Sequence, residues 1–244
     1  MVSVIIPVLN EGATIRKVIR NIRQSALPLE IIVVDDHSTD NTIEEAMKEP
    51  VRIITSSRRG KGLSMREGLL AAKSDFIVYL DGDITTYPPD VVDLLARPIL
   101  EGRADFVKST FKRQAGRVTQ LVAKPLLSIL FPDLAWLEQP LSGMIAGKKN
   151  LLEKVHFEKD YGVDIGLLID MHRMQARILE VNIGQVKNAM QGLEQLGKMS
   201  REVSRTILNK ADALGVQNMA TIGQIDLISR QMESSVRESL DKME

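Results

Sequence analysis

The chain has 244 residues, 44% of them hydrophobic and 26% charged, an ordinary balance for a globular protein that buries a sizeable core. Its 32 lysines and arginines equal its 32 aspartates and glutamates, so the formal net charge is zero and the basic surplus of a broad nucleic-acid footprint is missing. There is no cysteine, which excludes disulfides, thiolate metal sites and cysteine nucleophiles.

The first hundred residues alternate apolar runs with amphipathic segments. We predict strands at residues 2–8, 30–34, 51–55 and 76–80, and helices at residues 13–23, from about residue 41, and at residues 63–72. Ser38, Thr39 and Asp40 are residue types that cap the second of these helices. Strands that alternate with helices of this length predict βαβ units, and therefore a Rossmann-like, mainly parallel sheet flanked by helices.

The pattern changes after residue 83. We expect helices at residues 91–101, 118–130 and 163–174, and strands at residues 105–109, 141–146 and 178–183. Pro125 predicts a kink or a break in the second of these helices, because proline has no amide hydrogen to donate. The fold class that these elements indicate is α/β.

No strand is expected after about residue 193, and we predict a C-terminal helical extension there. Five apolar residues recur in it at helical spacing, namely Ile225, Ile228, Met232, Val236 and Leu240. Such a stripe packs either on its own domain or against a second copy in a homodimer, and the sequence leaves both open.

No segment of the sequence is expected to cross a membrane. The longest apolar stretch, residues 121–131, contains Lys124 and Pro125 and is too short to span a bilayer. The amino terminus lacks the basic region of a secretory signal. We therefore expect a soluble, cytoplasmic protein.

Each of the first four predicted strands ends in a polar cluster. The clusters are Asn10-Glu11, Asp35-Asp36, residues 56–61 and Asp81-Gly82-Asp83. Because the carboxyl ends of parallel strands share one edge, these clusters are expected to form one crevice, where open α/β sheets bind ligands. Two carboxylates of this kind can share a magnesium ion with a diphosphate. Asp-Gly is also common turn chemistry, so the pair alone does not establish a site.

The polar clusters favour nucleotide-sugar binding. Glu11 and Asp36 can accept hydrogen bonds from uracil or ribose, and Lys61 can meet a phosphate as a point charge. Residues 58–62 have the composition of an anion-binding loop before a helix, although an exposed basic loop has the same composition. The spacing of a P-loop is missing, and none of the three histidines has a partner at metal-ligand spacing.

Motifs in both halves of the chain resemble family 2-like glycosyltransferases of the A-type fold. In the first half the motifs are Val4-Ile5-Ile6-Pro7, Leu9-Asn10-Glu11, residues 32–36, residues 38–40, Gly60-Lys61-Gly62 and Asp81-Gly82-Asp83. In the second half, residues 107–109, 116–119, 121–127, 139–143 and 161–168 resemble the glucosyl-3-phosphoglycerate synthases and the related mannosyl enzymes. The resemblance covers about residues 2–200.

The resemblance implies a hexosyltransferase that acts with retention of configuration. Its donor is a nucleotide diphosphate sugar, with UDP-glucose favoured, its acceptor is 3-phosphoglycerate or a similar phosphorylated small acid, and its cofactor is Mg²⁺ or Mn²⁺. The implied glycosyltransferase domain spans residues 1–190, with a nucleotide-sugar half at 1–110 and an acceptor half at 111–190, followed by the helical extension at 191–244.

The resemblance also assigns roles to single residues. It places the donor at Pro7, Leu9, Asn10, Glu11, Asp36, Lys61, Asp81, Gly82 and Asp83. It places the acceptor at Gly116, Arg117 and Thr119, and it implies catalytic roles for Asp83, Arg117 and Asp164. Asp164 stands where the family has a glutamate, so the acid is kept one methylene shorter.

The implied protein ligands of the metal are Asp83 and Asn188. Asn188 stands where the family has a histidine, and Met190 stands where it has an asparagine that helps to hold the acceptor. An asparagine carbonyl can bind magnesium, but it is neutral and a weaker partner than imidazole for manganese. Two alternatives therefore stay open, namely transfer to another acceptor such as a polyprenyl phosphate, and a non-catalytic protein that binds nucleotide sugars.

Overall fold

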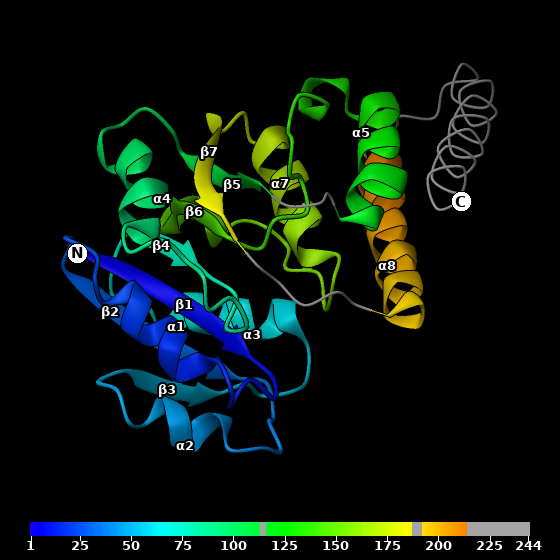
Figure 1. The fold of residues 1–244 in the computed structure, drawn as a ribbon. Helices are drawn as coiled ribbons and strands as arrows, with labels where there is room; N and C mark the ends of the chain where they lie inside the picture. Colours follow the sequence, from blue (N-terminus) through cyan, green and yellow to red (C-terminus); the bar gives the residue numbers. More distant parts are fainter. Residues whose placement is uncertain (113–115, 187–191, 214–244) are drawn as a thin grey trace.

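The computed structural model describes residues 1–112, 116–186 and 192–213, and within them seven strands form one sheet (Figure 1). The strands are β1 (Val2–Val8), β2 (Leu29–Asp35), β3 (Arg52–Thr55), β4 (Phe76–Tyr79), β5 (Phe106–Lys112), β6 (Ile145–Lys148) and β7 (Ile178–Gln185). Their order in the sheet is β3-β2-β1-β4-β6-β5-β7.

The sheet is mainly parallel, as the sequence predicted. β1 pairs in parallel with β2 and β4, β2 with β3, and β5 with β7. Only β6 runs the other way among the described strands, since it is antiparallel to both β4 and β5. The carboxyl ends of the six parallel strands therefore share one edge with the beginning of β6. The order of the strands reverses between β1 and β4, where sheets of this class bind their ligands.

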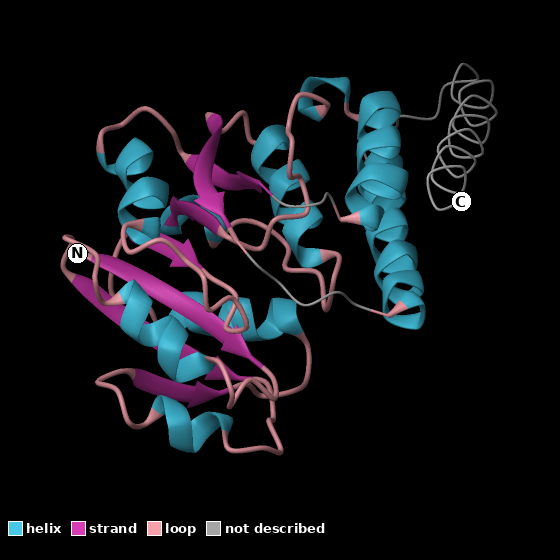
Figure 2. Cartoon of the chain, in the orientation of Figure 1, coloured by secondary structure: helices cyan, strands magenta, loops and turns pink. Residues whose placement is uncertain are grey.

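Helices cover both faces of the sheet (Figure 2). They are α1 (Ile15–Ile22), α2 (Thr42–Ala46), α3 (Lys61–Ala71), α4 (Val91–Leu100), the π-helix η1 (Thr119–Ala123), α5 (Lys124–Leu130), the 3-10 helix η2 (Pro132–Leu134), α6 (Lys149–Leu152), α7 (Val163–Arg173) and α8 (Leu193–Asp212). The apolar residues of α1 and α4 are buried on one face of the sheet, and those of α3 and α7 on the other. The fold is a three-layer α/β/α arrangement.

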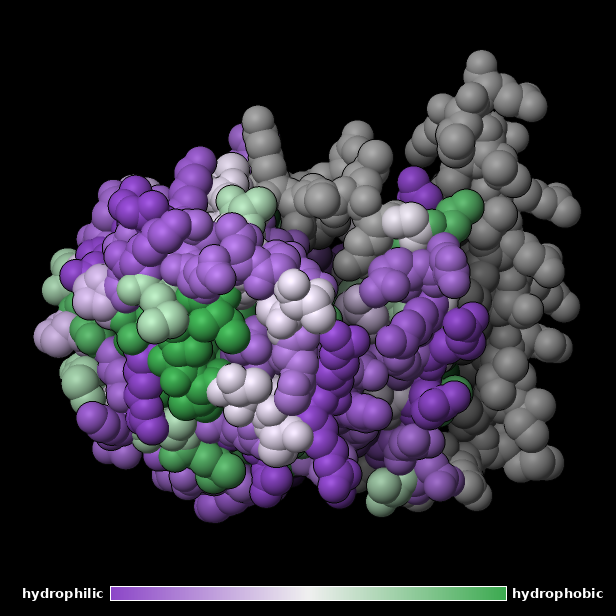
Figure 3. Space-filling model, turned by 90° about the horizontal axis from the view of Figure 1, so that it is seen from below, coloured by the Kyte–Doolittle hydropathy of each residue, from purple (hydrophilic) through white to green (hydrophobic). Residues whose placement is uncertain are grey.

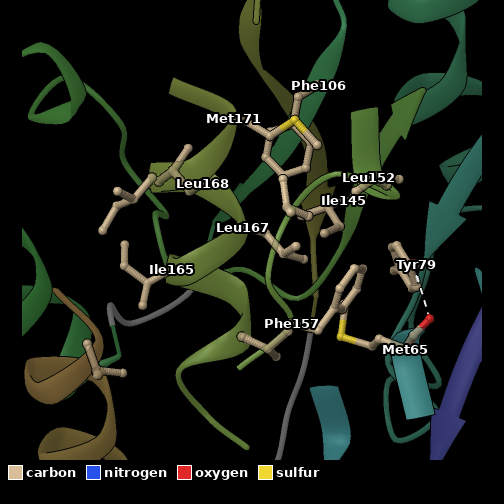
Figure 4. Packing of buried hydrophobic residues seen from close by; sticks show 14 of the residues in the cluster. Met65, Tyr79, Phe106, Ile145, Leu152, Phe157, Ile165, Leu167, Leu168 and Met171 are labelled. Atoms are coloured by element: carbon tan, nitrogen blue, oxygen red, sulfur yellow. Dashed lines mark hydrogen bonds between the residues drawn. The ribbon is translucent and has the colours of Figure 1, made fainter. Parts of the chain in front are cut away.

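The core beneath α3 and α7 holds both helices against the sheet. Figure 4 shows Met65 of α3 beside Tyr79 of β4, whose hydroxyl donates a 3.2 Å hydrogen bond to the Met65 carbonyl. Phe106 of β5 and Met171 of α7 are fully buried in the same cluster. Because α3 and α7 both begin at the carboxyl edge of the sheet, this packing fixes the positions of their first residues there.

The C-terminal extension begins with α8, which packs against α7, α5 and η1. Val203, Ile207 and Ala211 of α8 are buried at helical spacing, and Lys210 donates a 2.6 Å hydrogen bond to Asp170 of α7. The apolar stripe predicted between residues 225 and 240 lies outside the described residues. The division of the chain at residue 190 stays a prediction.

The strand predicted at residues 141–146 is wrong in its bounds, because β6 begins only at Ile145. Residues 141–144 form a turn in which the Ser142 hydroxyl lies 2.6 Å from the Ser109 hydroxyl and accepts a hydrogen bond from the Met144 amide at 3.2 Å. A serine side chain that bonds to nearby backbone in this way competes with the ladder of a strand.

The helix predicted at residues 118–130 is present in two parts, and Pro125 lies where they join. The five residues of η1 form a π-helix, and the α-helix α5 follows directly, with proline in its first turn. Since Pro125 has no amide hydrogen, it cannot complete an α-helical bond to the preceding turn.

The surface viewed from below is largely hydrophilic, with one compact apolar area left of its centre (Figure 3). None of the helices in the described part of the chain is both long enough and apolar enough to cross a membrane.

Asp105 joins the beginnings of β5 and β7 to the end of β6. Its carboxylate accepts hydrogen bonds from the Arg177 side chain at 2.8 and 3.0 Å and from Lys148 at 2.6 Å. The hydrogen bonds from Arg177, followed by that from Lys148, hold the pKa of Asp105 well below its usual range, although partial burial opposes them. This junction therefore stabilises the half of the sheet that carries β5, β6 and β7.

We expect Asp105→Asn to lower the free energy of unfolding at pH 7 by about 2 kcal/mol, because charged hydrogen bonds are lost. A carboxylate with a lowered folded-state pKa contributes stability above its unfolded pKa and loses it as the pH falls. The difference in the free energy of unfolding between wild type and variant, measured in denaturant titrations, should thus shrink below about pH 4. Glu101→Gln, which breaks an exposed pair with Arg103, is the control. An equal effect of both substitutions at pH 7 contradicts this role.

Candidate active site

A cavity of about 910 Å³ opens at the carboxyl edge of the sheet. Its walls come from the segments after β1, β2, β4 and β5, from the turn before β6, and from α7 and α8. Of the residues singled out in the sequence, it is lined by Pro7, Leu9, Glu11, Asp36, Lys61, Asp81, Asp83, Gly116, Arg117, Thr119 and Asp164. Segments far apart in the sequence thus contribute to one site.

Asn10 is not part of the cavity lining and joins two loops instead. It has a left-handed backbone, with φ of 57°, and its amide donates to the Ser38 hydroxyl at 3.0 Å. Its side-chain oxygen accepts a 2.8 Å hydrogen bond from the Thr39 amide. Beside it, the amide of Glu11 donates to the Thr42 hydroxyl at 2.8 Å. Asn10 therefore ties the loop after β1 to the loop after β2, and its contact with a nucleotide stays a prediction.

The acidic turn after β4 is held in place from two sides. The Tyr87 hydroxyl accepts from the Asp81 amide at 3.0 Å and donates to the Asp81 carbonyl at 3.1 Å. The Thr14 hydroxyl donates to the Gly82 carbonyl at 2.9 Å. Gly82 does not line the cavity, but a Cβ atom there would lie 1.9 Å from Oε2 of Glu11, so only glycine lets the turn approach Glu11 this closely.

The Asp36 carboxylate organises the loop between β3 and α3. It accepts hydrogen bonds from the Gly60 amide at 2.8 and 3.0 Å and from the hydroxyls of Ser56 and Ser64, each at 3.1 Å. Asp36 is 7% exposed, so protein donors engage both of its oxygens in a buried position. Asp36 therefore holds this loop, and its contact with uridine stays a prediction.

Lys61, the first residue of α3, bridges two carboxylates across the cavity. Its ammonium group lies 3.1 Å from Asp81 and 3.1 Å from Asp164. Burial alone would lower the pKa of Lys61, but the charges of Asp164 and Asp81 outweigh it and hold that pKa above its usual value. Gly143 packs directly against the pair, since a Cβ atom there would lie 2.7 Å from the Lys61 nitrogen.

Negative charge is concentrated around Glu11. Burial, followed by the charges of Asp83 and Asp81, raises the pKa of Glu11 to about 9, while Lys61 opposes the shift. Oε2 of Glu11 is buried and has no hydrogen-bond partner within the described residues. Three carboxyl groups thus converge where one lysine supplies the positive charge, and a bound cation would relieve their repulsion.

This donor set fits a divalent cation that is shared with a ligand. No group of three or more Asp, Glu, His or Cys residues able to hold a metal occurs in residues 1–112, 116–186 and 192–213. Asp81 and Asp83 offer two carboxylates, which is the number that magnesium usually takes before phosphate oxygens and water complete its shell. Asn188, the other predicted ligand, lies outside the described residues.

The predicted acceptor residues lie at the beginning of η1. Arg117 is exposed, whereas Thr119 is buried at 5% exposure. The backbone of Gly116 is close to the Thr119 hydroxyl, which would lie 3.5 Å from a Cβ atom on the glycine. A guanidinium, a hydroxyl and a glycine backbone at one point are groups that can bind a phosphate.

Lys108 supports the part of the cavity wall that contains Ser142 and Asp164, and it was not among the predicted site residues. It is fully buried, and its ammonium group donates to the Ser142 carbonyl at 2.5 Å and to the Asp164 carbonyl at 3.3 Å. Burial lowers the pKa of Lys108 to about 8, although the Asp164 charge opposes the shift. Lysine in a strand normally signals an exposed position, so the sequence pattern hides this role.

α8 contributes a further group that sequence reasoning missed. The Lys198 ammonium lies 5.9 Å from the centre of the Tyr161 ring, and the amide of Gln195 donates to the Tyr161 hydroxyl. All three residues line the cavity. No motif marks Gln195 and Lys198, because their place in the cavity depends on how α8 packs.

We expect Asp36→Asn to loosen the loop between β3 and α3, because an amide nitrogen cannot accept the hydrogen bonds that the carboxylate accepts. The free energy of unfolding should fall by roughly 1–3 kcal/mol. Trypsin should cleave after Arg58 and Arg59 faster than in wild type, measured by mass spectrometry of timed digests. Asp133→Asn, at a side chain that is 81% exposed, is the control. Unchanged cleavage in Asp36→Asn rules this support role out.

Comparison with known proteins agrees with this geometry. Residues 3–158 match the family described as Glycosyl transferase family 2. The chain is 37% identical over 236 residues to a glucosyl-3-phosphoglycerate synthase of Mycobacterium tuberculosis, covering 86% of this chain and 73% of the relative. It is 32% identical over 247 residues to such a synthase from Petrotoga mobilis, and this match covers 90% of this chain and 76% of the relative.

Solved structures show the same likeness. A crystal structure of the Mycobacterium tuberculosis synthase with Mn²⁺, uridine-diphosphate-glucose and phosphoglyceric acid superimposes with a TM-score of 0.82 at 37% identity, covering 87% of this chain and 80% of that one. A structure of that synthase with Mg²⁺ and uridine-diphosphate also matches with a TM-score of 0.82. The α/β fold is thus the A-type fold of these glycosyltransferases.

Proposed function

We infer that this chain, which belongs to glycosyl transferase family 2, moves glucose from UDP-glucose to 3-phosphoglycerate with retention of configuration. The observation that carries the proposal is the shared cavity. It joins Asp81, Asp83 and Lys61 to Arg117 and Thr119, which we assign to the acceptor phosphate. A donor and an acceptor can therefore meet in one enclosed space.

At the donor end, we assign the diphosphate to Asp81, Asp83 and a divalent cation. The convergence of these carboxylates with Glu11 supports this assignment, and relatives have been solved with Mn²⁺ or Mg²⁺ and uridine-diphosphate. A bound cation neutralises the charge that develops on the departing diphosphate. Asn188 remains our proposed second protein ligand. The surrounding Pro7, Leu9, Asn10, Glu11, Asp36, Lys61 and Gly82 form the proposed nucleotide-sugar site.

In the reaction, the bond from the anomeric carbon to the diphosphate breaks and a bond to the acceptor hydroxyl oxygen forms on the same face of the sugar. The proton of that hydroxyl leaves with the departing diphosphate. The Asp164 carboxylate faces this space. Its Oδ2 accepts a hydrogen bond from Lys61, whereas its Oδ1 is buried and has no hydrogen-bond partner within the described residues. A buried carboxylate oxygen favours a hydroxyl donor, so we assign Asp164 to a sugar hydroxyl. Lys61 keeps this carboxylate oriented and balances its charge.

At the acceptor end, we assign the phosphate to Gly116, Arg117 and Thr119. Arginine matches phosphate with a pair of parallel hydrogen bonds, which also orients the ligand. Within the described residues, Arg117 makes no ion pair, whereas Lys61 is engaged by two carboxylates. Arg117 is thus the better placed cation for an incoming anion.

The finer expectations stay proposals. They are a cytoplasmic location, a homodimer, the absence of nucleic-acid partners, and the division into a glycosyltransferase domain and a C-terminal extension. Transfer to another acceptor and binding without catalysis are the competing functions. UDP release from UDP-glucose, measured with and without 3-phosphoglycerate and with Mg²⁺ or Mn²⁺, separates the proposed function from both competitors. Release that does not depend on 3-phosphoglycerate, or none at all, contradicts the proposal.

Asp83→Ala should reduce metal-dependent turnover at least a hundredfold, because the diphosphate site loses a carboxylate that binds the cation. Asp75→Ala is the matched control, since Asp75 is exposed and lies just before β4, at the opposite end of the same strand. Initial rates should be measured across a range of Mn²⁺ concentrations. Full activity of Asp83→Ala at the metal concentration that saturates wild type places the metal elsewhere.

Arg117→Lys should raise the KM for 3-phosphoglycerate by roughly tenfold, because lysine loses the paired hydrogen bonds but keeps the charge. Arg117→Ala should raise it further. The Kd for UDP in the presence of Mn²⁺ should not change in either variant, and calorimetric titration checks this. A KM that stays at the wild-type value in Arg117→Ala contradicts the assignment of the phosphate.

A further inference from the structure

One cation in the cavity has no role in the proposed reaction. Among the described lining residues, the positively charged side chains are Lys61, Arg117 and Lys198. Lys61 is occupied by Asp81 and Asp164, each at 3.1 Å. Arg117 is assigned to the phosphate of the acceptor. Lys198 of α8 remains.

The surroundings of Lys198 leave its charge available to a ligand. Its ion pair with Glu202 is long, at 3.8 Å, and the Lys198 side chain is 52% exposed. An exposed pair of this kind contributes little free energy and is readily exchanged. The Glu202 carboxylate is itself held by the Tyr161 amide at 2.9 Å, so it has a second partner when the lysine moves.

Lys198 also lies on the acceptor side of the cavity. α8 packs against η1, whose first residue is Thr119, and Figure 1 shows α8 running beside α5, the direct continuation of η1. The ring of Tyr161 lies under the Lys198 ammonium and is fixed by Gln195. The aromatic face therefore favours a positive charge at this point of the wall.

We propose that Lys198 binds the carboxylate of the acceptor, opposite the phosphate site at Arg117. The proposal rests on the function inferred above, because 3-phosphoglycerate carries a phosphate at one end, a carboxylate at the other and the reacting hydroxyl between them. Arginine suits the phosphate through paired hydrogen bonds, and lysine suits the carboxylate as a compact charge. Holding both ends orients the hydroxyl and selects acceptors that carry the carboxylate.

The test compares two ligands that differ only in the group that Lys198 is proposed to bind. sn-Glycerol 1-phosphate keeps the phosphate and the hydroxyl of 3-phospho-D-glycerate in the same configuration, but it has a neutral hydroxymethyl group in place of the carboxylate. Calorimetric titration of both ligands into full-length protein with saturating UDP and Mn²⁺ gives their Kd values. The proteins are wild type, Lys198→Met, Lys198→Arg and, as a control, Arg201→Met, which removes a cation of α8 that does not line the cavity.

Wild type should prefer 3-phosphoglycerate, and Lys198→Met should weaken its binding by roughly tenfold to a hundredfold while leaving the Kd of sn-glycerol 1-phosphate unchanged. Lys198→Arg should restore most of the preference, and Arg201→Met should match wild type. Equal weakening of both ligands, no weakening of either, or no preference in wild type overturns the proposal. Failure of the proposed function is a separate observation, the absence of UDP release when wild type receives UDP-glucose and 3-phosphoglycerate.

Discussion

Lys61 holds the two sides of the cavity together, because its ammonium group meets Asp81 at the end of β4 and Asp164 at the beginning of α7. Without a positive charge between them, these carboxylates would repel each other and the nearby Glu11 and Asp83. The lysine thereby sets the distance between the acidic turn and α7. It also leaves negative charge in excess around Glu11, which favours a site that is completed by a cation and a ligand.

The topology explains why these groups meet. In the parallel part of the sheet, the ends of β1, β2 and β4 lie along one edge, and α3 starts there with Lys61. The antiparallel direction of β6 brings the turn before it to the same edge, where buried Lys108 fixes it by binding the Ser142 carbonyl. α7 and α8 close the other side. In the proposed function, the sheet provides the donor end and the later segments provide the acceptor end.

The parallel sheet and the acidic turn after β4 were predictable, since buried apolar runs and the polar residues that follow them are local signals. The bounds of β6 were not predictable, because the hydrogen bond between the side chains of Ser109 and Ser142 forms only after distant segments meet. Lys108 and Lys198 were missed for the same reason. Lys108 looks like an ordinary exposed residue of a strand and Lys198 like a solvated residue of a helix. Only packing buries Lys108 behind the cavity wall and places Lys198 in the cavity lining.

We infer that this cavity transfers glucose from UDP-glucose to 3-phosphoglycerate with retention. The most direct measurement is nuclear magnetic resonance of the product formed from these two substrates with Mn²⁺. We predict a glucosyl-3-phosphoglycerate whose anomeric centre has the α-configuration of the donor. A β-linked product, or free glucose and UDP without a linked product, contradicts the claim.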